Sequence, residues 1–142
     1  MIVNGGTRYA AHLLYEVKTF TGETIYKSEP QVLSMIEIAD SSYDAIIDGM
    51  HGVLSSSGDL KKAFGDFPAE IGAGGKTGTA QTSSTASNNA VFVSFAPLKE
   101  PEIVVACVIE RGANGYNASF AAREVLDRYF GLVEETDEVP AQ

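Results

Sequence analysis

A chain of 142 residues is long enough for one domain with a sizeable core, because a domain of this size buries about two thirds of its unfolded surface. Its 19 acidic and 10 basic residues give a formal net charge of −9, which argues against a nucleic-acid or anionic-membrane surface. No apolar run approaches about 18 residues, so we expect no bilayer-spanning segment within it. The single cysteine, Cys107, and two well-separated histidines predict neither a metal site nor a cofactor.

The first predicted elements are a β-hairpin and a helix. Residues 12–20 and 24–28 flank a turn at Gly22 and have the composition of paired strands. Apolar residues at helical spacing then predict a helix that starts near Ser41 and stops before Gly58. Its apolar stripe consists of Tyr43, Ile46, Ile47, Met50, Val53 and Leu54.

The second half of the chain predicts a sheet and one more helix. A polar link leads to the glycine-rich segment 70–82, and two β-branched apolar segments follow at 90–96 and 102–110. Their near-continuous apolarity indicates a sheet that is covered on both faces. Residues 117–131 predict a helix, and the acidic residues 132–142 are expected to be disordered.

The predicted order of elements is β-β-α-β-β-β-α. Consecutive strands joined by short loops indicate an antiparallel sheet, so the fold class is α+β with covering helices. In the last helix, Arg123 and Asp127, like Glu124 and Arg128, are four residues apart. This spacing predicts ion pairs on the outer face of that helix.

The segment "EIGAGGKTGTAQT", residues 70–82, raises the question of what approaches its backbone. A Walker-type phosphate loop would need glycine where Glu70 stands and a helix after Lys76, but the residues that follow are poor helix formers. As a strand, the segment sends Lys76, Gly78 and Ala80 to one face and Thr77, Thr79 and Gln81 to the other. A ligand that uses both sets must lie along the strand's edge, as a peptide added to a sheet does. The alternative is a glycine-rich strand beside a closely packed helix.

The segment "GKTGTAQ" resembles the Lys-Thr-Gly motif of penicillin-binding D,D-transpeptidases and serine β-lactamases. Four further segments, "NGGTRYAAHLL", "IIDGMHGVLSSSG", "VFVSFAP" and "IVVACVIE", resemble class B penicillin-binding proteins in the same order along the chain. The resemblance covers roughly residues 3–131. It implies that residues 1–131 are the C-terminal part of a transpeptidase domain, with a partial β-lactamase-like fold.

The resemblance also implies roles for five residues. Lys76 matches the motif lysine that supports proton transfer, and the backbone N–H of Thr79 matches half of the oxyanion hole. Thr77 matches the hydroxyl that binds the substrate's terminal carboxylate, Gly78 provides clearance, and Gln81 matches a residue that contacts acyl groups.

No serine stands three residues before any lysine, so the nucleophile motif S-x-x-K is absent from these 142 residues. A literal Ser-x-Asn, Ser87-Asn88-Asn89, follows Lys76 where the family motif precedes it, and we interpret it as coincidence. The sequence therefore predicts part of a longer enzyme and no acyl-enzyme from this chain alone.

The resemblance implies that the parent enzyme cross-links peptidoglycan stem peptides through a serine acyl-enzyme outside the cytoplasmic membrane. Its implied ligands are the D-Ala-D-Ala end of a stem peptide and β-lactams. An edge of the sheet left open is expected to promote self-association. The alternatives are a non-catalytic β-lactam sensor or peptide-binding module of the same fold, then a serine β-lactamase, and last a nucleotide-binding protein.

Overall fold

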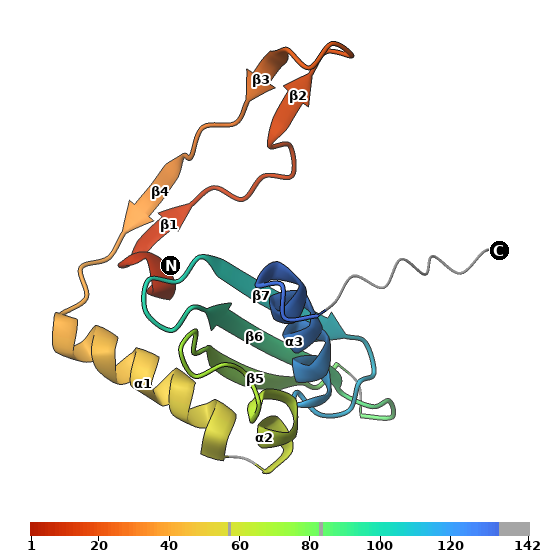
Figure 1. Ribbon diagram of the computed structural model, residues 1–142. Coiled ribbons are helices and arrows are strands. Elements are labelled where there is room, and N and C mark those ends of the chain that lie inside the picture. Colours follow the sequence, from red (N-terminus) through yellow and green to blue (C-terminus); the bar gives the residue numbers. More distant parts are fainter. Residues whose placement is uncertain (57, 83, 134–142) are drawn as a thin grey trace. The chain divides into compact units, whose positions relative to one another are not determined.

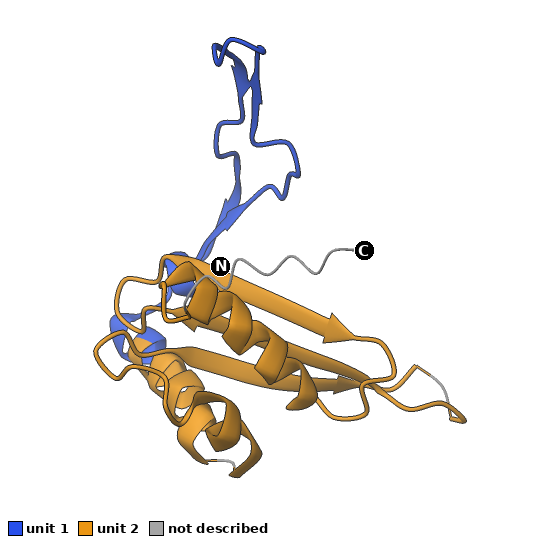
Figure 2. Ribbon diagram, turned by 45° about the vertical axis from the view of Figure 1, so that its right-hand side comes forward, with its two compact units in different colours: residues 1–43 blue, residues 44–142 orange. Residues whose placement is uncertain are grey.

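The computed structural model describes residues 1–56, 58–82 and 84–133. These residues divide into two compact units, the first from residue 1 to 43 and the second from residue 44 onward (Figure 2). The sequence predicts a disordered acidic segment at residues 132–142, and residues 134–142 of it lie outside the described residues. None of the helices in the described ranges is both long and apolar enough to cross a membrane.

The first unit contains two separate pairs of antiparallel strands, β1 with β4 and β2 with β3 (Figure 1). Its elements are η1 (Ile2–Asn4), β1 (Thr7–Tyr9), β2 (Glu16–Lys18), β3 (Thr24–Lys27) and β4 (Val32–Met35). The predicted hairpin is confirmed as β2 and β3, although both strands are shorter than expected. β1 and β4 were not predicted, because three or four residues are too few to show a period of two.

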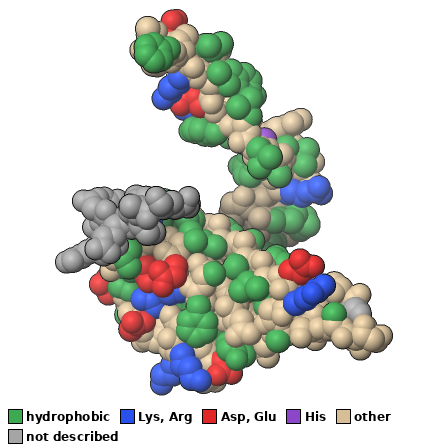
Figure 3. Space-filling view, turned by 90° about the vertical axis from the view of Figure 1, so that its right-hand side faces the viewer, with side chains coloured by type: hydrophobic (Ala, Val, Ile, Leu, Met, Phe, Trp, Pro, Cys, Tyr) green, Lys and Arg blue, Asp and Glu red, His purple; other side chains and the backbone are tan. Residues whose placement is uncertain are grey.

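Polar and backbone contacts, and no apolar core, hold this unit. Of its residues, all of which are described, Gly6 alone is buried. Large hydrophobic side chains lie along its surface (Figure 3), and Leu13 and Phe20 are fully exposed at 105% and 107%. The Thr24 hydroxyl donates to Glu16 at 2.7 Å, and the same carboxylate pairs with Lys18 at 2.9 Å.

The second unit is built on a three-stranded antiparallel sheet of order β5-β6-β7 (Figure 1). The strands are β5 (Gly74–Ala80), β6 (Asn89–Ala96) and β7 (Ile103–Ile109). All three predicted strands are confirmed, and β6 pairs in continuous register with both neighbours. β7 is not covered on both faces as expected, because Val104 and Val108 are exposed at 52% and 63%.

Three helices pack against one face of this sheet: α1 (Asp40–Ser56), α2 (Gly58–Phe64) and α3 (Asn117–Tyr129). The predicted helices α1 and α3 are confirmed, whereas α2 lies where the sequence predicts a polar link. Helices and sheet share one cluster of buried side chains, and Phe64 of α2 lies 5.8 Å from Phe92 of β6 between ring centroids. The cluster comprises Leu54, Leu60, Ala63, Phe64, Ala73, Ala90, Phe92, Ala96, Ala118, Ala122 and Leu126.

The predicted pair Arg123–Asp127 forms, but its predicted position on the outer face of α3 is wrong. The Arg123 and Asp127 side chains are only 15% and 11% exposed, and their Nε–Oδ1 distance is 2.7 Å. Arg123 also donates through Nη1 to the Ala63 carbonyl at 2.7 Å and to the Asp66 carboxylate at 2.6 Å. Its guanidinium lies 5.2 Å from the Phe67 ring centroid. The guanidinium therefore joins α3 to the end of α2 and to the loop after it.

The hydrogen bond and charge of Arg123 hold the pKa of Asp66 below its ordinary value of about 3.9. A carboxyl with a depressed folded pKa stabilises the fold above its unfolded pKa, and this stabilisation is lost as the pH falls through the folded value. In a pH titration followed by carbon-detected NMR, we expect the Asp66 carboxyl to titrate with a midpoint below a pH of about 3.9. In Arg123→Gln, the midpoint should return to the ordinary value. Lys62→Gln is the control and should leave it unchanged, because Lys62 pairs with Asp59. An unshifted midpoint in the wild type would contradict the contact.

Ser94 lies on the helix-facing side of β6 and is fully buried. Within the described residues its hydroxyl has no hydrogen-bond partner. Because a buried unsatisfied hydroxyl is unfavourable, Ser94→Ala should raise the free energy of unfolding by about 1 kcal/mol in urea denaturation. Ser119 is the matched control: it is equally buried but donates to the Tyr116 carbonyl at 2.6 Å, so Ser119→Ala should lower stability. Destabilisation by both substitutions would show that the Ser94 hydroxyl does have a hydrogen-bond partner.

Candidate functional site

The structure places four of the five predicted site residues, Lys76 to Thr79, on β5. Among the strands of residues 1–56, 58–82 and 84–133, β5 is an outer strand, since the sheet order gives it β6 as its neighbour on one side only. In an antiparallel outer strand, alternate backbone N–H and C=O groups point away from the paired neighbour. The segment is thus neither the mouth of a helix nor a strand in the middle of the sheet. It offers a free edge to an extended ligand.

The strand begins buried and becomes accessible along its length. Gly74 and Gly75 are buried, whereas Lys76, Thr79 and Ala80 are exposed. A Cβ on Gly75 would lie 2.8 Å from the Phe92 ring and 2.9 Å from Leu54. Glycine is therefore required at the start of β5, where the strand packs under α1. At this position the segment is the glycine-rich strand beside a closely packed helix that the sequence offered as an alternative.

Lys76 supplies a positive charge beside this edge. Its ammonium group donates a hydrogen bond to the Thr77 carbonyl oxygen at 2.6 Å, which folds the side chain along the strand. In a chain of net charge −9, an exposed cation at the free edge favours an anionic ligand group there.

The connector between β7 and α3, residues 110–116, lies against β5 and was missed by the sequence reasoning. The Gly115 N–H donates to the Thr79 hydroxyl at 3.4 Å. A Cβ on Gly115 would overlap the Gly78 carbonyl oxygen and would lie 2.9 Å from the Val91 carbonyl oxygen. The signal in the sequence was the run "RGANGYN", whose glycines and asparagines favour a tight, irregular turn.

Two asparagines at the start of β6 hold this connector. The Asn89 side chain accepts from the Arg111 N–H at 3.0 Å, and the Asn88 carbonyl accepts from the Ala113 N–H at 2.9 Å. Both donors have positive φ, 55° and 64°. The literal Ser-x-Asn of the sequence therefore ends at residues that support the connector.

Gln81, the fifth predicted residue, follows the last residue of β5 and is exposed. It belongs to the turn between β5 and β6. Within the described ranges, no group of three or more His, Cys, Asp or Glu side chains could hold a metal ion.

Comparison with known proteins identifies the chain's family. Residues 1–130 match the family described as "Penicillin binding protein transpeptidase domain". Among curated relatives, penicillin-binding protein 2A of Bacillus subtilis is 28% identical over 99% of this chain and 22% of its own length. Peptidoglycan D,D-transpeptidase MrdA of Escherichia coli K12 is 26% identical over all of this chain and 24% of its own length. The chain thus spans about a quarter of the curated relatives it matches.

Solved structures agree with this match. PBP2 of Pseudomonas aeruginosa, solved in complex with WCK 5153, is 30% identical over 99% of this chain and 29% of its own, with a TM-score of 0.68. Penicillin-binding protein A of M. tuberculosis, an imipenem acyl-enzyme complex, shares the fold with a TM-score of 0.73 at 24% identity, over 91% of this chain and 28% of its own. The chain belongs to the penicillin-binding protein transpeptidase domain family.

Proposed function

We propose that residues 1–131 are the C-terminal part of a transpeptidase domain that cross-links peptidoglycan stem peptides, and that residues 132–142 are an acidic extension. The observation that carries this proposal is the placement of Lys76, Thr77, Gly78 and Thr79 on an outer strand with a free edge. Such an edge can take the extended D-Ala-D-Ala end of a stem peptide as an added strand.

Four residues of β5, and Gln81 after it, then have roles. Lys76 provides the cation that supports proton transfer and attracts the substrate's carboxylate. The Thr77 hydroxyl donates a hydrogen bond to that carboxylate, and Gly78 leaves room for the peptide. The Thr79 backbone N–H is one of two donors to the oxyanion, whose loss typically costs a factor of about 10² to 10³ in rate. Gln81 contacts the acyl group from the turn after β5.

The attacking serine and its lysine base are proposed to lie outside these 142 residues, because the sequence contains no S-x-x-K. In the complete enzyme, the serine oxygen attacks the carbonyl of the penultimate D-Ala, and the terminal D-Ala leaves with a proton. The amine of a neighbouring stem peptide then attacks the ester, which forms the cross-link and frees the serine.

A β-lactam would acylate the same serine, as the imipenem acyl-enzyme of the M. tuberculosis relative suggests by analogy. Because peptidoglycan lies outside the cytoplasmic membrane, we propose that the complete enzyme acts on the outer side of that membrane.

Labelling with a fluorescent penicillin tests this proposal. The 142-residue chain is compared with the protein translated from the complete reading frame that contains it. We expect no covalent adduct on the chain, an adduct on the complete protein, and loss of that adduct in Lys76→Ala. Lys99→Ala, which changes an exposed lysine outside β5, is the control and should label normally. An adduct on the chain alone, or a complete frame without S-x-x-K, would refute the proposal.

We further propose that the isolated chain self-associates through β7. β7 is the other outer strand of the sheet, and Val104 and Val108 expose an apolar face beside its edge. Edges of this kind pair with other chains unless charges block them.

Sedimentation velocity tests this contact. It should show dimers of the wild-type chain and monomers of the double variant Val104→Lys/Val108→Lys. A monomer at about 1 mM wild-type chain would exclude this contact, since even weak pairing is populated there.

A further inference from the structure

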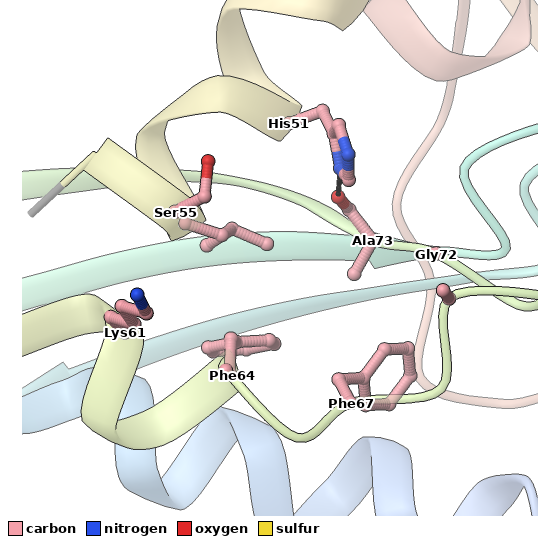
Figure 4. Close-up of a pocket in the computed structure, with 10 residues that line it drawn as sticks. His51, Ser55, Lys61, Phe64, Phe67, Gly72 and Ala73 are labelled. Carbon is pink, nitrogen blue, oxygen red and sulfur yellow. Dashed lines mark hydrogen bonds between the residues drawn. The ribbon is translucent and has the colours of Figure 1, made fainter.

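A cavity of about 190 Å³ opens between the end of α1, α2 and the loop that leads into β5 (Figure 4). Its apolar lining includes Leu54, Phe64 and Ala73, which are buried members of the core, and the half-buried Phe67. A closed apolar cavity of about 150 Å³ is large enough to bind benzene. The size and lining of this cavity therefore suit one small aromatic ring.

The aromatic side of the cavity is fixed before any ligand binds. The Phe64 ring packs against Phe92 of the sheet at 5.8 Å and against Phe67 at 6.1 Å, tilted by 56°. Phe67 is held in turn by the Arg123 guanidinium at 5.2 Å and by Phe130 at 6.4 Å. A ring that enters the cavity can meet these rings edge to face without repacking them.

The rim of the cavity is polar and carries one cation. Lys61 lines it and, within the described ranges, forms no ion pair, whereas its neighbour Lys62 pairs with Asp59 at 3.1 Å. His51 contacts the Ala73 carbonyl through Nδ1 at 2.8 Å, so Nε2 remains for another partner. Figure 4 shows His51 across the cavity from Phe64 and Phe67. An apolar interior with a lysine at its mouth is complementary to a ring that bears a negative charge.

We propose that this cavity binds a small aryl carboxylate, with the ring beside Phe64 and Phe67 and the carboxylate at Lys61. The site uses no residue of the β5 edge, so it is independent of the proposed transpeptidation. It contacts the segment that enters β5, because Ala73 immediately precedes Gly74. Binding will therefore be visible in the amide signals at the start of that strand.

The test is an NMR titration of the 142-residue chain with 4-ethylbenzoate and its neutral analogue 4-ethylbenzamide. The carboxylate should shift the amide signals of Phe67, Gly72 and Gly74 with a dissociation constant on the order of 1 mM. The amide should bind about three- to fivefold more weakly, as expected for one exposed charge pair.

Two pairs of variants make the test specific. Lys61→Met should remove the preference for the carboxylate, whereas Lys62→Met should keep it. Ser55→Phe should block the cavity, whereas Ser56→Phe, which lies outside the lining, should not. Equal affinities for carboxylate and amide, a preference that survives in Lys61→Met, or no saturable shift up to tens of millimolar ligand would overturn the proposal.

Discussion

Replacing Arg123 with alanine is expected to lower the free energy of unfolding by about 3–5 kcal/mol, because it leaves a buried carboxylate without its partner. The Asp127 side chain is 11% exposed, and Nε of Arg123 donates a hydrogen bond to its carboxylate at 2.7 Å. The same substitution removes the hydrogen bond to the Ala63 carbonyl and the contact with Phe67. Urea denaturation followed by circular dichroism measures the change.

The two acidic partners of Arg123 provide the matched comparison. The Asp66 side chain is 84% exposed, so Asp66→Ala should destabilise the protein much less than Arg123→Ala does, because a solvent-exposed ion pair contributes little. Arg123→Ala/Asp127→Asn should recover part of the loss, because the uncompensated charge is gone. A small effect of Arg123→Ala alone would mean that solvent reaches Asp127, and it would contradict the contact described between α2 and α3.

Replacing Gly115 with alanine is expected to destabilise the protein by about 1–3 kcal/mol and to displace β5. The new methyl group would overlap the Gly78 carbonyl oxygen, a backbone atom that cannot rotate away as a side chain can. The strand or the connector must therefore move. Amide chemical shifts of Gly78 and Thr79 report the displacement directly, and thermal denaturation reports its cost.

Gly78 is the control for Gly115, since the two residues touch. A Cβ on Gly78 would lie 3.4 Å from the Val91 Cβ, an ordinary contact, so Gly78→Ala should change stability by less than about 1 kcal/mol. In the complete protein it should nevertheless slow labelling by penicillin, because the methyl group narrows the approach to the proposed site. Equal destabilisation by both substitutions would contradict the packing described for the connector.

The strands of the main sheet could be predicted from the sequence because local and global signals agree there. Residues 90–96 and 102–110 are β-branched and apolar and flank a proline-rich turn, and they form β6 and β7 within one residue of the predicted ends. The glycine segment was identified as a strand by what it lacks: helix formers after Lys76 and a glycine at position 70.

The sequence could not predict contacts that depend on tertiary packing. Spacing alone paired Arg123 with Asp127, but only the position of α2 makes that pair an interior one. In α3 the apolar Val125 is 48% exposed and the polar Ser119 is fully buried, the reverse of what hydrophobicity alone indicates. Similarly, nothing in the local sequence of residues 110–116 indicates that Gly115 lies against a strand 36 residues away.

The proposed function depends on whether a peptide can add as a strand to the free edge of β5, and an NMR titration measures this binding. The isotope-labelled chain is titrated with diacetyl-L-lysyl-D-alanyl-D-alanine, and amide shifts are compared between β5 and β7. We predict saturable shifts concentrated at Lys76 to Ala80, with none along Ile103–Ile109. Shifts along β7 instead, or a β5 that stays unperturbed at the highest soluble peptide concentration, would contradict it.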